Sequence, residues 1–207
     1  MPRTRSRPRT EEKFQHAVLK LVAEDGCGSL GINSVAKLAG ADKVLIYRYF
    51  GDFNGLLQRV ADSRQWLPSC GEMLEALSGN EEDGLSRLRR IERILSQHIR
   101  GDASTHQLVR WRRTNICPIC ETFSEEWHRL WQALPSAMSQ TLATEQRTLW
   151  SQACALLALT IEADLCGEPV DRRCLENIAR GLETGQIEAS AESEPTIKDD
   201  SLPTNLL

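Results

Sequence analysis

Long apolar runs and aromatic residues are scarce in this 207-residue sequence, in which Phe, Trp and Tyr make up only 5%. No run approaches the roughly 18 apolar residues of a membrane span, so we expect neither a span nor a membrane partner. The basic N-terminus is not followed by an apolar stretch, and we expect no secretory signal. Seven cysteines without such a signal predict reduced thiols in a cytoplasmic protein rather than a disulfide framework.

Signatures of catalytic sites are also missing. The sequence has no G-x-S-x-G elbow and no glycine-rich phosphate loop, and its four histidines show no H-x-x-x-H spacing. We therefore expect no enzyme activity, no cofactor and no resident metal. Alternating runs of β-branched residues are absent too, which together with helical apolar spacings predicts an all-α fold.

Charge is divided unevenly along the chain. The net charge of −4 combines 11 Lys and Arg against 7 Asp and Glu through Trp66 with 14 against 22 in the remainder. The first third is therefore basic, at +4, and the rest acidic, at −8. A basic N-terminal part is typical of a protein that meets nucleic-acid phosphates.

The most informative stretch runs from Gly31 to Phe50 and has the layout of two short helices joined by a tight turn. Gly40 predicts the end of the first helix, because glycine readily takes the left-handed conformation of a helix stop. Asp42 is expected to accept a backbone N–H at the start of the second helix. Ile46 and Phe50 are four residues apart and share the inward face. The outward side, expected to contact DNA in the major groove, carries Lys43, Val44, Leu45, Tyr47, Arg48 and Tyr49.

This stretch resembles the helix-turn-helix of TetR-family transcriptional regulators over roughly Glu11 to Val60. The sequence departs from the family at Phe53, where many members carry a phosphate-contacting Lys, and at Leu45, where a smaller or hydroxyl residue is commoner. We therefore expect an apolar contact from Leu45 to a base, such as a thymine methyl. The resemblance is carried by Ala36, Ala39-Gly40, the run Tyr47-Arg48-Tyr49-Phe50, and Leu56 with Leu57.

The resemblance implies an all-α protein with an N-terminal three-helix DNA-binding domain and a C-terminal helical domain for effector binding and dimerisation. We place the DNA-binding domain at residues 11–50, a connecting helix at 51–67 and the C-terminal domain at 68–187. Residues 188–207 are polar and are predicted to be disordered.

Residues 1–10 form a basic arm in which arginines alternate with Pro, Thr and Ser, and such a segment is disordered when free. One interpretation is a solubilising tail, and the other is an arm that follows phosphates or enters the minor groove. In the second case the contacts come from Arg5, Arg7 and Arg9. Asn33 and Ser34 begin the second helix, where we expect them to cap it or to contact phosphate.

Helix-end signals and apolar spacing predict the remaining helices. Thr10 is expected to cap the first helix, and Asp52 a fourth helix that runs to about Trp66. A last helix is expected to be capped by Asp171. The other body helices are expected over residues 84–100, 108–115, 118–135 and 144–164.

The helix over residues 144–164 is apolar nearly all round its centre, which calls for burial on more than one side. The resemblance implies that the last two body helices of each subunit form a four-helix dimer interface. A monomer whose own helices cover this surface is the alternative. The residues expected at the interface are Ala153, Leu157, Ile161, Leu175, Ile178 and Leu182.

Tryptophan dominates the aromatic residues of the body, and indole rings offer large contact areas with one N–H donor. Two roles fit them: lining an effector cavity between helices, or forming plain core. The residues expected to contact an effector are Arg110, Trp111, Phe123, Trp127, Trp131 and Trp150.

Cys117 and Cys120 form a C-x-x-C pair, the spacing found in zinc and redox sites. Zinc needs two further ligands, which folding would have to recruit from residues such as Cys70 or His128. Packing beside a helix N-terminus is the preferred interpretation, and Cys27 is likewise expected to be a buried packing residue. A redox- or metal-responsive regulator that uses Cys117 and Cys120 remains an alternative.

Together these features predict a ligand-responsive transcriptional regulator. The simplest form is a repressor that binds a pseudo-palindromic operator as a homodimer and is released by a small-molecule effector. There are two alternatives. The protein could be an activator, or it could be an interaction protein that keeps the helix-turn-helix as a scaffold without binding DNA.

Overall fold

The computed structural model describes residues 7–78, 83–114, 117–139, 144–169 and 173–184. Every regular element in this part of the chain is helical, which confirms the predicted all-α fold. The first elements are α1 (Arg7–Asp25), the short 3-10 helix η1 (Cys27–Ser29), α2 (Ile32–Ala39), α3 (Val44–Phe50) and α4 (Phe53–Ala61). The others are α5 (Cys70–Leu77), α6 (Gly84–Gly101), α7 (Ala103–Trp111), α8 (Pro118–Met138), α9 (Thr144–Cys166) and α10 (Arg173–Thr184).

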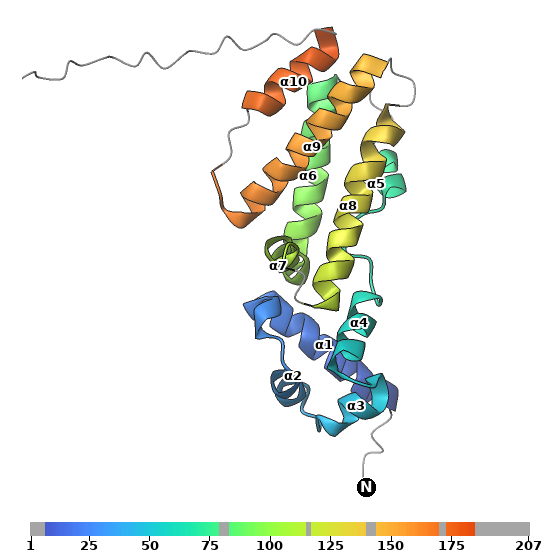
Figure 1. Cartoon of the computed structure of the whole chain (residues 1–207), viewed down its shortest axis with the longest axis vertical. Helices are drawn as coiled ribbons and strands as arrows, with labels where there is room; N and C mark the ends of the chain where they lie inside the picture. Colours follow the sequence, from blue (N-terminus) through green and yellow to red (C-terminus); the bar gives the residue numbers. More distant parts are fainter. Residues whose placement is uncertain (1–6, 79–82, 115–116, 140–143, 170–172, 185–207) are drawn as a thin grey trace, which may run out of the picture.

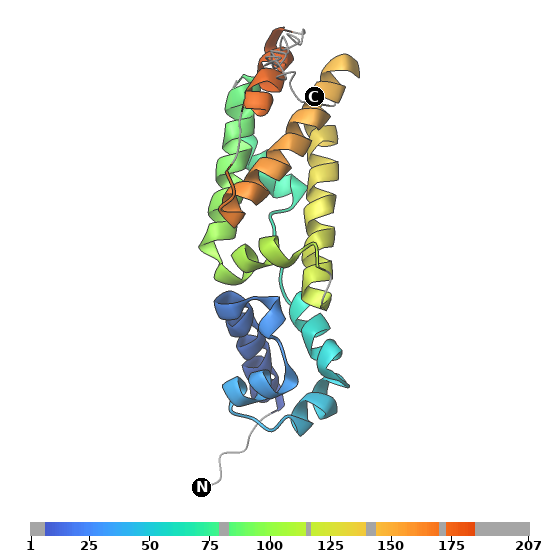
Figure 2. The ribbon, with the colours of Figure 1, turned by 60° about the vertical axis from the view of Figure 1, so that its left-hand side comes forward.

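The molecule is elongated, with a head and a body stacked along its long axis (Figure 1). The head consists of α1 to α4, and the body of α5 to α10 with the long helices α6, α8 and α9 alongside one another. The short helix α7 lies between the two parts in both views (Figure 2) and packs on α1 as well as on α6 and α9. The head also meets the body where α4 packs on α8.

One apolar core holds the four helices of the head together. α1 contributes Phe14, Val18 and Val22, whose spacing of four residues places them on one face, and none of the three is exposed. Helices of seven to nine residues are unstable alone in water, so α2, α3 and α4 depend on this core. They contribute Val35, Ile46, Leu56, Leu57 and Val60.

The first helix starts earlier than predicted. α1 begins at Arg7, so Thr10 lies buried inside the helix and is not its cap. Arg7 Nε forms an i,i+4 ion pair with Glu11 Oε1 (2.6 Å), and Pro8 is compatible with a first helical turn. The predicted arm therefore loses residues 7–10 to the helix, and residues 1–6 lie outside the described part.

The connecting helix is shorter than predicted. α4 ends at Ala61 instead of continuing to Trp66, although Asp52 caps its start as predicted by accepting the N–H of Gly55 (2.6 Å). Trp66 lies in the following loop with its ring fully buried, and its Nε1 donates to the Ala61 carbonyl (3.2 Å). Residues 51–67 are thus a short helix followed by an anchored loop.

Two body helices begin at caps that apolar spacing did not reveal. α7 starts at Ala103, before the predicted residue 108, because Asp102 accepts the N–H of Thr105 (2.7 Å). α5 was not predicted, yet Ser69 and Glu72 form a complete capping box at its N-terminus.

The later helices follow the prediction more closely. α8 continues through Pro135 to Met138, one turn beyond its predicted end, and α9 covers the predicted range to within two residues. The cap expected at Asp171 and the tail at residues 188–207 lie outside the described residues.

α9 includes one stretch, Gln146–Cys166, that is long and apolar enough to cross a membrane by length and composition alone. In this fold 44% of its most apolar window is buried inside the chain. α6, α7, α8 and α10 all pack on α9.

The close approach of α3 to α4 requires glycine at position 55. A Cβ atom at Gly55 would lie 2.1 Å from the backbone carbonyl oxygen of Phe50, which cannot rotate away as a side chain would. This contact sets how closely the end of α3 approaches the start of α4.

Gly55→Ala is expected to destabilise the protein by about 1–3 kcal/mol, because overpacking must shift backbone in the head. Gly101→Ala is the matched control, since a Cβ at this helical glycine meets nothing within 4 Å. The control should leave stability unchanged or raise it slightly. Urea unfolding of both variants measures the difference, and equal midpoints would contradict the proposed contact.

Candidate nucleic-acid interface

α2, the following turn and α3 form the predicted helix-turn-helix. Gly40 ends α2 in the left-handed conformation (φ 60°, ψ 38°), as predicted. Asp42 Oδ1 accepts the N–H of Val44 (2.9 Å), which satisfies one of the free donors at the start of α3. α2 itself begins at Ile32, earlier than expected, with Gly31 at its N-cap and no side-chain cap.

One side of α3 is fixed to the head. Ile46 is fully buried, and the ring of Phe50 packs edge-on against Phe14 of α1 at a centroid distance of 6.3 Å. The inward pair predicted from sequence therefore orients the helix. The opposite side of α3 is left facing solvent.

The outward side carries the side chains predicted to contact DNA. Val44 is 61% exposed and Tyr47 is 53% exposed, so one large apolar and one aromatic side chain meet solvent on this side of the helix. Lys43 and Arg48 are exposed beside them, and Leu45 and Tyr49 are half-buried at the edges of this surface. The six residues thus lie around one helical surface of mixed basic, apolar and phenolic character.

The start of α2 belongs to the same surface. Asn33 and Ser34 are exposed, and Asn33 Oδ1 accepts a hydrogen bond from Lys43 Nζ (3.3 Å) across the two helices. This bond places α2 beside the first turn of α3.

The arginines expected in the arm divide into two groups. Arg5 lies outside the described residues, whereas Arg7 and Arg9 are exposed on the first turn of α1. The guanidinium of Arg7 lies over the ring of Tyr49, with 5.2 Å from Cζ to the centroid. Arg7 therefore brings its positive charge to the edge of the α3 surface as part of a folded helix.

The residues predicted to contact an effector are mostly packed into the body. Phe123, Trp127 and Trp150 are buried, and the rings of Phe123 and Trp127 lie 6.3 Å apart. Trp131 is half-buried 5.9 Å from Trp127, and Arg110 is exposed on α7, where it donates to the Cys166 carbonyl (3.3 Å). These contacts favour the second role left open for the aromatics, that of plain core.

A small cavity lies elsewhere, between the loop before α5 and the side of α8. Its volume is about 330 Å³. Leu67, Pro68 and Cys70 line it on one side, and Glu126, Arg129, Leu130 and Ala133 on the other. None of the residues predicted for effector binding lines this cavity.

Trp111, which was also predicted to contact an effector, packs its indole against the head. A Cβ at Gly26 would lie 2.3 Å from Nε1 of Trp111, and one at Gly28 would lie 2.8 Å from Cη2. The ring therefore spans both glycines of the turn between α1 and α2. Gly26 also has φ 76°, so glycine is required there by conformation as well as by space.

The loop after α4 is fixed to the body by a partly buried hydrogen-bond network. Glu126 Oε2 of α8 accepts the backbone N–H groups of Trp66 (2.9 Å) and Leu67 (3.0 Å). The Trp66 carbonyl lies 3.0 Å from His98 Nε2 of α6. We call the turn at η1, this loop, α7 and the first turn of α8 the joint.

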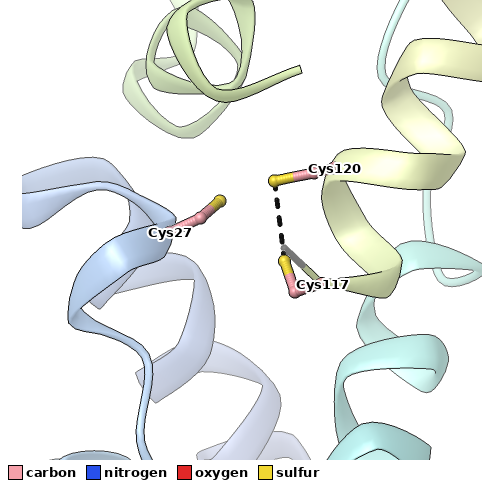
Figure 3. Close-up of side chains that lie close together, drawn as sticks. All are labelled: Cys27, Cys117 and Cys120. Atoms are coloured by element: carbon pink, nitrogen blue, oxygen red, sulfur yellow. Dashed lines mark hydrogen bonds between the residues drawn. The ribbon is translucent and has the colours of Figure 1, made fainter. Parts of the chain in front are cut away.

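The joint also contains three buried cysteines, Cys27 of η1 with Cys117 and Cys120 (Figure 3). Their sulfur atoms lie within 4.8 Å of one another. Cys117 is the N-cap of α8, and its hydrogen bonding with Cys120, with Cys27 and with backbone N–H groups of the first turn lowers the pKa of its thiol. Hydrogen bonding to Cys117 raises the pKa of the other two thiols.

The predicted dimer residues on α9 face the interior of their own chain. Ala153, Leu157 and Ile161 are fully buried against the chain's own helices, and Leu175 of α10 is also buried. Because α9 is apolar all round, sequence alone did not show which side the body covers. Ile178 is half-buried, and the side chain of Leu182 lies outside the described ones.

Comparisons with known proteins bear on this architecture. No family model and no curated protein matches the sequence. Among solved structures, HlyIIR, a hemolysin II transcriptional regulator, superposes with a TM-score of 0.55 over 86% of this chain and 98% of its own, at 16% identity. The chain has the fold of HlyIIR. A TetR-family regulator from Rhodococcus sp. matches with a TM-score of 0.46 over 86% of this chain and 98% of its own, at 17% identity.

The match with HlyIIR covers most of both chains, so head and body belong to one shared fold. This confirms the predicted fold of a helix-turn-helix head joined to a helical body. The joint residues that sequence reasoning missed are Glu126 and Cys27. Neither has a local signal, because each acquires its partners from a distant segment.

Glu126→Ala is expected to destabilise the protein by about 1–3 kcal/mol, because the N–H groups of Trp66 and Leu67 would lose their acceptor. Alanine favours helix at this position, so a loss of stability reports on the hydrogen bonds. Glu125→Ala, at an exposed position of the same helix, is the control. Thermal unfolding of the two variants compares them, and an equal effect of both would rule out the anchoring role.

Proposed function

We propose that this protein is a TetR-family transcriptional regulator that binds double-stranded DNA as a homodimer and responds to a ligand held by its body. The observation that carries the proposal is the exposed surface of α3. Val44 and Tyr47 stand in solvent beside Lys43 and Arg48, on the side opposite the buried Ile46. A short helix with this surface fits the major groove, and the fold shared with HlyIIR, itself a transcriptional regulator, supports the assignment.

Each side chain has a role that follows from its chemistry. Val44 and Leu45, near the start of α3, would give apolar contact to bases, and Lys43 would reach a base edge or a phosphate. Tyr47 and Tyr49 would donate hydrogen bonds to phosphates, and Arg48 would bind phosphate or guanine. Asn33 and Ser34 of α2 would contact the backbone and fix the position of the head.

A second copy of the chain would cover the exposed side of α9. Leu159 is 54% exposed, and Ala155 and Leu156 lie one turn before it on the same side. Gln152 extends this stripe of exposed and half-buried residues toward the N-terminus of α9, and Ala163 extends it toward the C-terminus. Two-fold pairing along the stripe would place two heads on a pseudo-palindromic operator.

The ligand would act by changing the angle between head and body. A dimer reads two half-sites at once, so a small rotation of each head at the joint alters the match to successive grooves. We propose release of DNA on ligand binding, with the protein as a repressor. The contacts of Trp111 with the Gly26 turn and of Glu126 with the Trp66 loop support a joint that transmits such a rotation.

Selection of binding fragments from the organism's genomic DNA with purified protein tests the proposal directly. An enriched pseudo-palindrome is the expected result. Binding that lacks sequence preference and disappears with salt would overturn the regulator assignment.

Tyr47→Ala is expected to weaken binding to the selected operator by about 10-fold or more, because a hydrogen bond to a charged phosphate is lost. Tyr47 is exposed, so the variant should fold and dimerise as the parent does. Tyr47→Phe removes only the hydroxyl and separates its contribution from that of the ring. Fluorescence anisotropy with labelled operator gives the affinities, and an unchanged affinity for Tyr47→Ala would refute the assignment of α3.

Leu159→Arg is expected to convert the dimer to monomer, because two charges would be buried against each other across the two-fold axis. Glu125→Arg introduces the same side chain at an exposed position of α8 and should leave the dimer intact. Sedimentation velocity distinguishes the states. A Leu159→Arg protein that still sediments as a dimer would show that the subunits pair elsewhere.

A further inference from the structure

Three cysteine side chains from separate parts of the chain converge where head and body meet (Figure 3). Cys27 lies in η1, immediately before the helix-turn-helix, and Cys117 and Cys120 lie at the first turn of α8. All three are buried, and their Sγ atoms lie within 4.8 Å of one another. The C-x-x-C pair thus acquires a third thiol that its spacing in the sequence did not reveal.

The distances between the sulfurs suit a metal ion. Two thiolates bound at about 2.3 Å to one zinc ion lie about 3.8 Å apart in a tetrahedral site and about 4.0 Å apart in a trigonal site. The Sγ atoms of Cys117 and Cys120 are 3.6 Å apart. Cys27 would have to approach them by no more than about 1 Å to complete the set.

The chemistry of the set selects soft ions. Thiolates prefer zinc, cadmium and copper(I) to magnesium or calcium. Position at the N-terminus of α8 favours the thiolate at Cys117, which is the form that binds metal. The cluster contains no fourth His, Cys or carboxylate among the described residues. An exogenous fourth ligand or three-coordinate binding is therefore expected.

We infer that Cys27, Cys117 and Cys120 form a three-thiolate site for a thiophilic metal ion, and that this ion is the ligand to which the regulator responds. The regulatory role of the ion rests on the proposed function, whereas the metal site itself does not. Binding requires no oxidation: each cysteine donates as a thiolate, and any thiol proton still present passes to solvent.

The position of the site gives the ion its effect. Cys27 belongs to the head and leads through Leu30 and Gly31 into α2, whereas the other two ligands belong to the body. An ion bound by all three fastens η1 to α8 and shifts the turn that Trp111 covers. Coupling between two sites of one protein is typically about 5- to 150-fold in affinity, and it is reciprocal.

Titration of the full-length protein with Cd²⁺ in the presence of a phosphine reductant tests the site. We expect one ion per chain with ultraviolet sulfur-to-cadmium charge transfer, and competition by Zn²⁺. Cys27→Ser and Cys120→Ser should each weaken binding by more than the roughly 10–100-fold that follows loss of an outer-shell partner. Charge transfer that is unchanged in both variants would overturn the inference.

Two further variants keep this test interpretable. Cys27→Ala preserves a small apolar side chain at the buried position, so it checks that lost binding does not reflect misfolding. Cys70→Ser with Cys166→Ser removes two partly exposed cysteines outside the cluster and should leave stoichiometry and affinity unchanged. Loss of the ion in this control would place the metal on the surface and refute the site.

Operator affinity with and without Cd²⁺ then tests the regulatory role. We expect a change of about 5- to 150-fold, and the operator should change the affinity for Cd²⁺ by the same factor. An operator that binds equally well in both states would refute the role of the ion as ligand and leave DNA binding intact. A protein that binds Cd²⁺ at the three thiols but selects no operator would refute the proposed function and keep the site.

Discussion

The close packing of Trp111 on a glycine turn of the head is the contact on which the arrangement of this protein depends. Gly26 and Gly28 leave room for the indole, and any Cβ at either position would overlap it. Because the ring spans the turn, the head has little freedom to slide on α7. The orientation of α3 relative to the body therefore depends on a contact that lies more than 10 residues away from α3 in sequence.

Hydrogen bonds add direction to this packing. Apolar contact alone tolerates small rotations, whereas Glu126 must keep two N–H groups of the Trp66 loop within bonding distance. Ser104 of α7 adds a bond to the Leu19 carbonyl of α1 (3.0 Å). The joint is thus held by three sets of contacts: at the Gly26 turn, at the Trp66 loop and along α1. A ligand that displaces one of these contacts must also overcome the other two.

Sequence reasoning succeeded where the determinants are local and failed where they are not. Gly40, Asp42 and the pair Ile46 and Phe50 act within a few residues, so the helix-turn-helix and its outward surface could be predicted. Distant helices decide which side of α9 the body covers. Because the centre of α9 is apolar on nearly every side, the sequence could not show that Leu157 is buried and Leu159 exposed. Cys27 likewise gains meaning only when folding brings it to the C-x-x-C pair. A residue role that requires a partner from another segment needs the fold before it can be assigned.

The joint and the proposed dimer surface of α9 are also connected through consecutive residues of one chain segment. Trp111 touches the head, and the next residue, Arg112, forms a buried ion pair with Glu162 of α9 while its guanidinium lies 5.0 Å from the centroid of Trp127. Glu162 is the neighbour of Ala163, which lies on the exposed stripe of α9. Glu162 also forms an ion pair with Arg113 (2.9 Å). A buried charge cannot lose its partner without a large cost in free energy, so Arg112 and Glu162 must move together. A displacement of Trp111 at the joint is therefore resisted by α9, and pairing of two subunits along α9 would stiffen the joint in both.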